Sequence, residues 1–172
     1  MPDVDRDHIR RMRDTAEGFL ADGDHLSQYP FSRSDAQYLL RLIGFEILLK
    51  ATLYLHGRIP AKNHRYDALF AALPAEAQVR LLRGARNRVG SLKGFDDLPG
   101  LLGTLGRNFV ALRYPFSAYE GMTDGDVAAS ADRWIDEGAP DSSATFVYWP
   151  EELFGLTEAF RLELTSVLDP PV

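Results

Sequence analysis

The side chains most able to do chemistry lie in a single segment, residues 107–120. It gathers guanidinium groups, an amide, phenol rings and a carboxylate, from Arg107, Asn108, Arg113, Tyr114, Tyr119 and Glu120. Guanidinium groups pair with phosphate oxygens, and aromatic rings stack on unpaired bases. We therefore predict that these six residues contact a ligand such as RNA or a nucleotide. The alternative is structural, with arginines complementing the negative end of a helix and tyrosines covering the core.

The other residue types that carry chemistry show no recognisable site pattern. The chain has no cysteine, which excludes disulfides and thiolate catalysis. The four histidines lack metal-ligand spacing, and neither a Gly-x-Ser-x-Gly elbow nor a glycine-rich phosphate loop is present. Gly100, Gly103 and Gly106 lie within a leucine stripe, and we interpret them as points of close helix packing. We expect no metal ion and no cofactor.

Charge is distributed unevenly along the chain. The net charge is −6, yet residues 77–119 hold seven basic side chains against two acidic ones, whereas residues 120–172 hold twelve acidic against two basic. The negative net charge argues against a protein that coats nucleic acids in general. The basic middle either presents an anion-binding face or is neutralised by the acidic C-terminal part folding back onto it.

Helical periodicity dominates the sequence and predicts an all-α fold. Apolar residues recur at helical spacing in about five to seven segments, most clearly 4–21, 35–56, 98–112 and 150–168. Segment 35–56 is apolar nearly all round, so we place it at the centre of a helical bundle. Residues 145–149 are aromatic and β-branched, and they predict a short extended segment or a lone strand.

Residues that end or cap helices predict the boundaries. Breaks are expected at Gly23, Tyr29-Pro30, His56-Gly57 and Tyr114-Pro115. N-terminal caps are expected at Ser34, Asn63 and Asp126.

The length of 172 residues fits one domain, and we predict a single helical domain over residues 1–172. We expect a core at about 34–120, with the N-terminal helix 4–21 and the acidic C-terminal extension 121–172 packed on it. The N-terminus is charged, it has no apolar signal core, and no apolar run could span a bilayer. We therefore expect a cytoplasmic protein with no membrane association.

Three motifs make the core at 34–120 resemble the HEPN superfamily of helical, RNA- and nucleotide-associated modules. The family's Glu-x-x-x-Lys-x-x-Leu helix is similar to Glu46-Ile-Leu-Leu-Lys50-Ala-Thr-Leu53. Its His-Asp-Leu segment is similar to His64-Arg-Tyr-Asp67-Ala-Leu69. An Arg-Tyr-Pro ending in one branch is similar to Phe109-Val-Ala-Leu-Arg113-Tyr114-Pro115, with Glu120 downstream.

This resemblance implies a four-helix core, a homodimer, and a cleft between the last bundle helices of two subunits. It also implies an RNA, nucleotide or protein partner. The residues expected to support the ligand-binding segment are Glu46, Lys50, His64 and Asp67. We expect Glu46 and Lys50 to face Arg113 or Tyr114.

In ribonucleases of this family, four to six residues separate an arginine from a histidine that follows it. The histidine handles the proton and the arginine stabilises phosphate charge. The positions after Arg86, Arg107 and Arg113 hold other residues, and we expect no arginine in the chain to have a histidine at that spacing. We therefore predict a non-catalytic HEPN-like module that binds RNA, a nucleotide or a partner protein, in a stress, defence or toxin–antitoxin setting. The alternatives are a homodimeric scaffold or adaptor with a structural Arg-Tyr-Pro corner, and a degenerate metal-independent ribonuclease using Tyr119 or Glu120 as the base.

Overall fold

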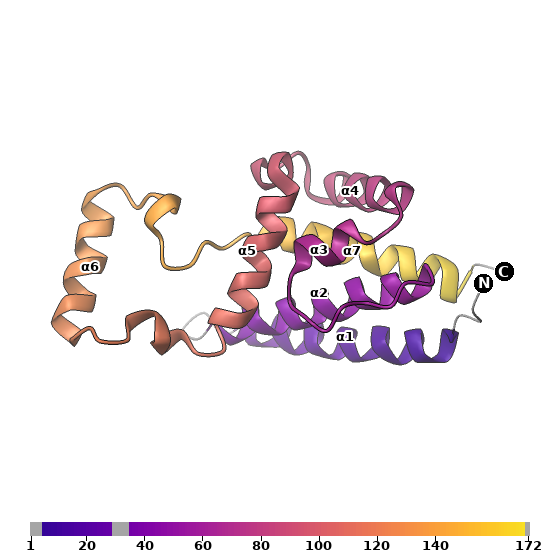
Figure 1. Cartoon of the computed structure of the whole chain (residues 1–172), viewed down its shortest axis with the longest axis horizontal. Coiled ribbons are helices and arrows are strands. Elements are labelled where there is room, and N and C mark those ends of the chain that lie inside the picture. Colours follow the sequence, from indigo (N-terminus) through magenta and orange to yellow (C-terminus); the bar gives the residue numbers. More distant parts are fainter. Residues whose placement is uncertain (1–4, 29–34, 171–172) are drawn as a thin grey trace.

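The computed structural model describes residues 5–28 and 35–170, and this part of the chain is an all-α bundle without a strand (Figure 1). Its helices are α1 (Arg6–Ser27), α2 (Ala36–Leu55), α3 (Tyr66–Ala71), α4 (Ala75–Val89), α5 (Leu98–Ala111), α6 (Asp124–Asp136) and α7 (Pro150–Leu168). Three 3₁₀ turns join them, namely η1 (Lys93–Asp97), η2 (Pro115–Tyr119) and η3 (Asp141–Ser143). The all-α prediction is confirmed, and residues 145–149 form a loop and not a strand.

The central helix is α2, which packs against α1 along one side and α7 along another. Its Phe45 ring contacts Tyr66 of α3 and Phe160 of α7, with centroid separations of 5.5 and 5.6 Å. Apolar residues lie on every face of α2. They leave water only if neighbouring helices cover the helix on all sides. Its position therefore follows from its sequence.

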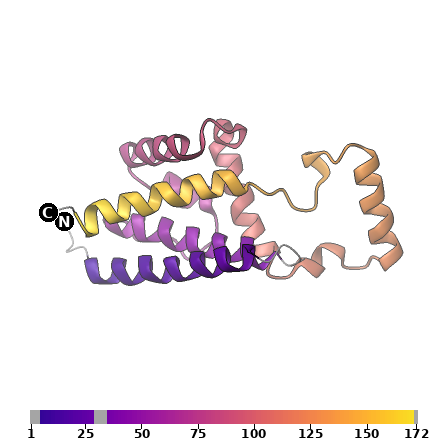
Figure 2. The ribbon, with the colours of Figure 1, turned by 180° about the vertical axis from the view of Figure 1, so that it is seen from behind.

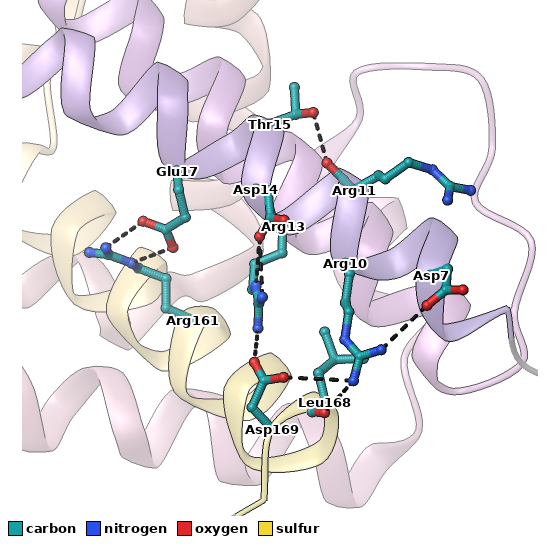
Figure 3. A network of polar contacts seen from close by, with 10 residues as sticks. All are labelled: Asp7, Arg10, Arg11, Arg13, Asp14, Thr15, Glu17, Arg161, Leu168 and Asp169. Carbon is teal, nitrogen blue, oxygen red and sulfur yellow. Dashed lines mark hydrogen bonds and ion pairs between the residues drawn. The ribbon is translucent and has the colours of Figure 1, made fainter.

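A polar seam joins the outer edges of α1 and α7 (Figure 3). The Arg161 guanidinium pairs with both carboxylate oxygens of Glu17, and Arg13 pairs with Asp169. Arg10 donates to the carbonyl oxygen of Leu168 at 2.9 Å. These contacts fix α7 beside α1 without using core side chains.

Acidic side chains of α7 neutralise part of the basic middle of the chain. Arg80 of α4 pairs with Glu163 at 2.6 Å, and Arg88 lies 3.6 Å from Glu158. The Glu152 carboxylate accepts a hydrogen bond from the backbone nitrogen of Gly94, which follows α4. The C-terminal helix therefore folds back onto α4, as one of the two sequence alternatives requires.

Two predicted helix boundaries are wrong. Gly23 does not end α1, which continues to Ser27; a Cβ atom at Gly23 would lie 3.1 Å from the Gln37 carbonyl oxygen, so the glycine permits close approach to α2. Asp126 does not cap α6; Thr123 is the cap, and Asp126 at the third helical position completes a capping box with it. The breaks predicted at Tyr29-Pro30 and the cap at Ser34 lie outside the described residues.

The cap predicted at Asn63 is also displaced. Helix α3 begins only at Tyr66, with Arg65 before it. The Asn63 side-chain oxygen instead accepts a hydrogen bond from the Arg65 backbone nitrogen at 3.1 Å. Asn63 therefore shapes the turn that leads into α3.

The expected extension 121–172 divides into two parts with different surroundings. Helix α7 lies in the bundle, whereas α6 extends away from it in both views, in a segment that we call the arm (residues 115–148; Figure 2). Helix α6 has no buried residue. The arm returns to the bundle through Asn108, whose side-chain amide donates to the Val147 carbonyl oxygen at 2.8 Å.

The loop before α3 lies directly on α5 at Gly106. A Cβ atom at this position would lie 2.3 Å from the backbone oxygen of His64 and 3.4 Å from the backbone nitrogen of Tyr66. The expected role of Gly106 in close packing is therefore seen here, although its partner is a loop.

We expect Gly106→Ala to lower the free energy of unfolding by about 1–3 kcal/mol, because the obstructing oxygen belongs to the backbone and cannot rotate away. Gly18→Ala is the matched control, since a Cβ atom there meets nothing within 4 Å. It should raise the free energy of unfolding by about 0.5–1 kcal/mol through helix propensity. Urea denaturation followed by circular dichroism measures both, and equal stabilisation by the two variants would contradict the close approach.

Candidate anion-binding groove

An open groove of about 850 Å³ lies between the loop before α3 and the exposed side of α5. The charged and titratable side chains that line it are Lys62, His64, Arg65, Asp67 and Arg107. Its apolar floor includes Val110 and Ala111. The groove thus brings together residues from two segments about forty positions apart in the chain.

Positive charge in the groove is only partly neutralised. Arg65 pairs with Asp67 at 2.9 Å, which lowers the pKa of that carboxyl through a direct hydrogen bond. Arg107 is exposed and donates to the Thr104 hydroxyl at 2.8 Å. Among the described residues, no carboxylate lies within ion-pair distance of Arg107 or Lys62. Their charges are therefore available to an external anion.

A buried ionic cluster holds the groove from below. Glu46 of α2 is only 7% exposed, and its carboxylate accepts from Lys50 at 2.7 Å. The same carboxylate lies 2.9 Å from the Nδ1 atom of His64. The expectation that Glu46 and Lys50 face Arg113 or Tyr114 is wrong, since Lys50 pairs with Glu46, and the second partner of Glu46 is His64.

The Phe109 ring connects this cluster with Arg113. The His64 ring lies against it with centroids 4.5 Å apart, and the Arg113 guanidinium lies 4.7 Å from its centroid. Such a cation–π contact holds an arginine side chain without neutralising its charge. Arg113 is exposed but is not among the groove-lining residues.

The remaining predicted ligand contacts lie elsewhere. Asn108 is 5% exposed, and its amide is used by Val147, so it has a structural role. Tyr114 is 60% exposed and packs edge-on against Phe116. Tyr119 lines a separate hollow inside the arm, and exposed Glu120 follows the η2 turn. Of the six predicted residues, Arg107 alone lines the groove. Asn108 is buried and Arg113 packs on Phe109, whereas the Tyr114-Pro115 break turns the residues after it into the arm.

Lys62 and Arg65 are groove residues that the sequence reasoning missed. The signal was a basic loop, and Arg58 and His64 within it have five residues between them. This is the arginine–histidine spacing of the family's ribonucleases, so the expectation that no arginine in the chain has a histidine at that spacing is wrong. Arg58 is exposed but does not line the groove.

No three His, Asp or Glu side chains within 5–28 and 35–170 are arranged to hold a metal ion. Over the same ranges, no helix combines the length and the apolar character needed to cross a bilayer. None of the family models, curated proteins or solved structures compared with this chain matches it. The HEPN resemblance therefore stays a prediction.

Tyr66, beside the ionic cluster, gives the protein a dependence on high pH. Its hydroxyl donates to the Leu42 carbonyl oxygen at 3.2 Å, and burial, aided by the nearby Glu46 carboxylate, raises its pKa well above the ordinary value. The unfolded chain releases this proton near the ordinary tyrosine pKa of about 10, whereas the folded chain retains it. The stabilisation is therefore complete below that pH and is lost as pH rises above it.

We expect the free energy of unfolding to fall above about pH 10, with Tyr66 contributing up to about 1.4 kcal/mol per pH unit. Urea titrations between neutral and alkaline pH measure this slope. Tyr66→Phe should unfold more easily at neutral pH, since it lacks the hydrogen bond, and should show a shallower alkaline slope. An unchanged slope in Tyr66→Phe would contradict the assignment to this residue.

Proposed function

We propose that the groove between α5 and the loop before α3 binds the phosphate groups of RNA or a nucleotide. The single observation that carries this proposal is the exposed Arg107 guanidinium, which faces the groove beside Lys62 without a carboxylate partner among the described residues. An arginine donates paired hydrogen bonds to phosphate oxygens, and a lysine adds a mobile positive charge. The proposal keeps the ligand class that the sequence predicted, but most of the residues that contact the ligand are different.

The shape of the surface around Arg107 favours a ligand longer than one phosphate. Arg107 also lines a second depression, of about 330 Å³, whose other members include Lys93, Asp97, Thr104 and Trp149. One arginine thus stands between two hollows, each with its own lysine. A single-stranded RNA backbone repeats its charge along such a path, so successive phosphates can reach both hollows.

We expect Arg107→Ala to weaken binding of a labelled single-stranded oligouridylate by about tenfold to a hundredfold, as the loss of a charge-assisted hydrogen bond requires. The dependence of log affinity on log salt should become shallower by about 0.7, the share of one phosphate contact in a single strand. Fluorescence anisotropy at several salt concentrations measures both quantities.

Arg11→Ala is the matched control, because Arg11 is exposed and points outward from α1 (Figure 3). It should bind the oligouridylate as the unaltered protein does. A comparison with ATP separates RNA from mononucleotide binding. The proposal fails if the unaltered protein binds neither probe at low salt, or if the two arginine variants lose affinity equally.

A metal-independent ribonuclease is a second candidate function, favoured by one observation: His64 lines the same groove as Arg107. Its Nδ1 atom faces Glu46, and because an ionised carboxylate only accepts, that nitrogen carries the proton. The other ring nitrogen is then the basic one. Tyr119 and Glu120, the bases first considered, lie outside the groove.

If this second candidate is right, the protein cleaves RNA in the presence of EDTA, and His64→Asn abolishes the cleavage. Asparagine keeps a donor near the Glu46 carboxylate, so groove binding of oligouridylate should persist in that variant. Gel analysis of RNA fragments measures the activity. Intact RNA after incubation with the unaltered protein would leave binding as the function.

A helical scaffold or adaptor, a protein partner and a stress or defence setting stay predictions. The Arg113-Tyr114-Pro115 corner fits a structural role in part, since Arg113 packs on Phe109. Tyr114, in contrast, is largely exposed. Absence of any anion binding would favour the scaffold.

A further inference from the structure

The arm is an acidic element with nothing packed on most of its surface. Residues 120–148 hold seven acidic side chains and one arginine. No ion pair among the described residues uses any of these acids. Helix α6 buries none of its residues, and only Val127 and Trp134 are partly covered.

An α-helix of this length gains little stability on its own. Isolated helices shorter than about 12–15 residues are marginal in water, and most helices in proteins depend on packing. The capping box of Thr123 and Asp126 supports only the first turn of α6. The free face of the arm therefore requires a covering surface.

The inner side of the arm offers a recess for an apolar side chain. A hollow of about 330 Å³ lies between α6 and residues 143–148. Its aromatic members are Tyr119, Trp134, Phe146 and Tyr148. The Trp134 ring is held in place by donation from its Nε1 atom to the Pro140 carbonyl oxygen at 3.0 Å.

A surface whose charge and shape complement the arm is present on the same chain. The loop before α3 carries exposed Lys62 and Arg65, and Arg107 faces it across the groove. Ile59, in the same loop, is 88% exposed and is the most exposed large apolar residue among those described. A basic groove beside a protruding isoleucine matches an acidic arm with an aromatic recess.

We infer that the arm of one molecule docks on the groove and loop of a second copy of this chain. The arm extends away from its own bundle in both views, so it leaves its own groove open (Figures 1 and 2). A reciprocal exchange between two copies buries both arms and closes a two-fold dimer. Asp124 and Glu137 are exposed and lie three positions from the recess residues Val127 and Trp134, so helical spacing places them beside the recess. Their attraction to the groove lysine and arginines provides the specificity.

This dimer and the proposed ligand use the same groove, so each excludes the other. An RNA strand in the groove releases the partner's arm, and added oligouridylate should shift the dimer toward monomer. The dimer itself does not require that RNA be the ligand. The two ideas therefore fail separately, one in a sedimentation experiment without RNA and the other in a binding experiment.

The test is sedimentation velocity of the full chain over a wide concentration range. We expect a dimer that weakens with salt. Reversal of the two exposed arm charges beside the recess, Asp124→Lys with Glu137→Lys, should raise the dimer dissociation constant at least about tenfold, because both attractions become repulsions. The matched control is Asp22→Lys with Glu76→Lys, two exposed residues of α1 and α4, which changes net charge equally and should leave the dimer intact.

A complementary variant and a mixture complete the experiment. Lys62→Glu with Arg107→Glu should also give monomers, and mixing it with the arm variant should restore a dimer, since the two reversed surfaces attract each other. Ile59→Ser should weaken the dimer without altering charge. A monomeric unaltered protein, or a dimer that survives both reversals, would overturn the inference.

Discussion

The buried carboxylate of Glu46 is the constraint on which the candidate site depends. A carboxylate that is almost fully covered must be paired, because its desolvation is otherwise very costly. Lys50 supplies one partner from the same helix, and His64 supplies the other from a loop eighteen residues away. Pairing with His64 fixes the loop over α5, where the glycine at position 106 lets the two backbones meet.

The position of that loop decides where positive charge is exposed. Lys62 and Arg65 flank His64 in sequence, so anchoring the histidine carries both to the edge of α5. There they meet Arg107, whose side chain extends from the helix on the same side. The groove is therefore a consequence of one buried ion cluster together with one close backbone approach.

The acidic residues in the C-terminal part of the chain fall into two groups with different partners. The acids of α7 are used within the molecule, where Glu163 and Glu158 neutralise arginines of α4. The acids of the arm have no such partners among the described residues. The neutralisation expected for the basic middle is therefore seen at α4, whereas anion binding at the open groove beside α5 stays a proposal. A linear count of charge could not separate these two groups.

The helical class, the central place of α2 and the stop at Tyr114-Pro115 followed from the sequence alone. They depend on the spacing of apolar residues and on the backbone of proline, which are local properties. The ends of the helices were predicted less accurately. Gly23, for example, was expected to end α1, but it lies within the helix and allows close packing with α2. The segment 107–120 shows the same limit, since α5 ends at Ala111 and the chain from Pro115 onward carries Tyr119 into the arm.

Tertiary structure alone decided the partner of Glu46, the membership of the groove and the isolation of the arm. Each of these joins residues far apart in the chain, and a loop sequence carries no signal of the helix it will face. His64 and Arg107 come together because the buried Glu46 carboxylate and the missing side chain at position 106 act on the same short loop. Local periodicity determines which segments become helices, whereas burial and pairing of polar groups determine which side chains meet.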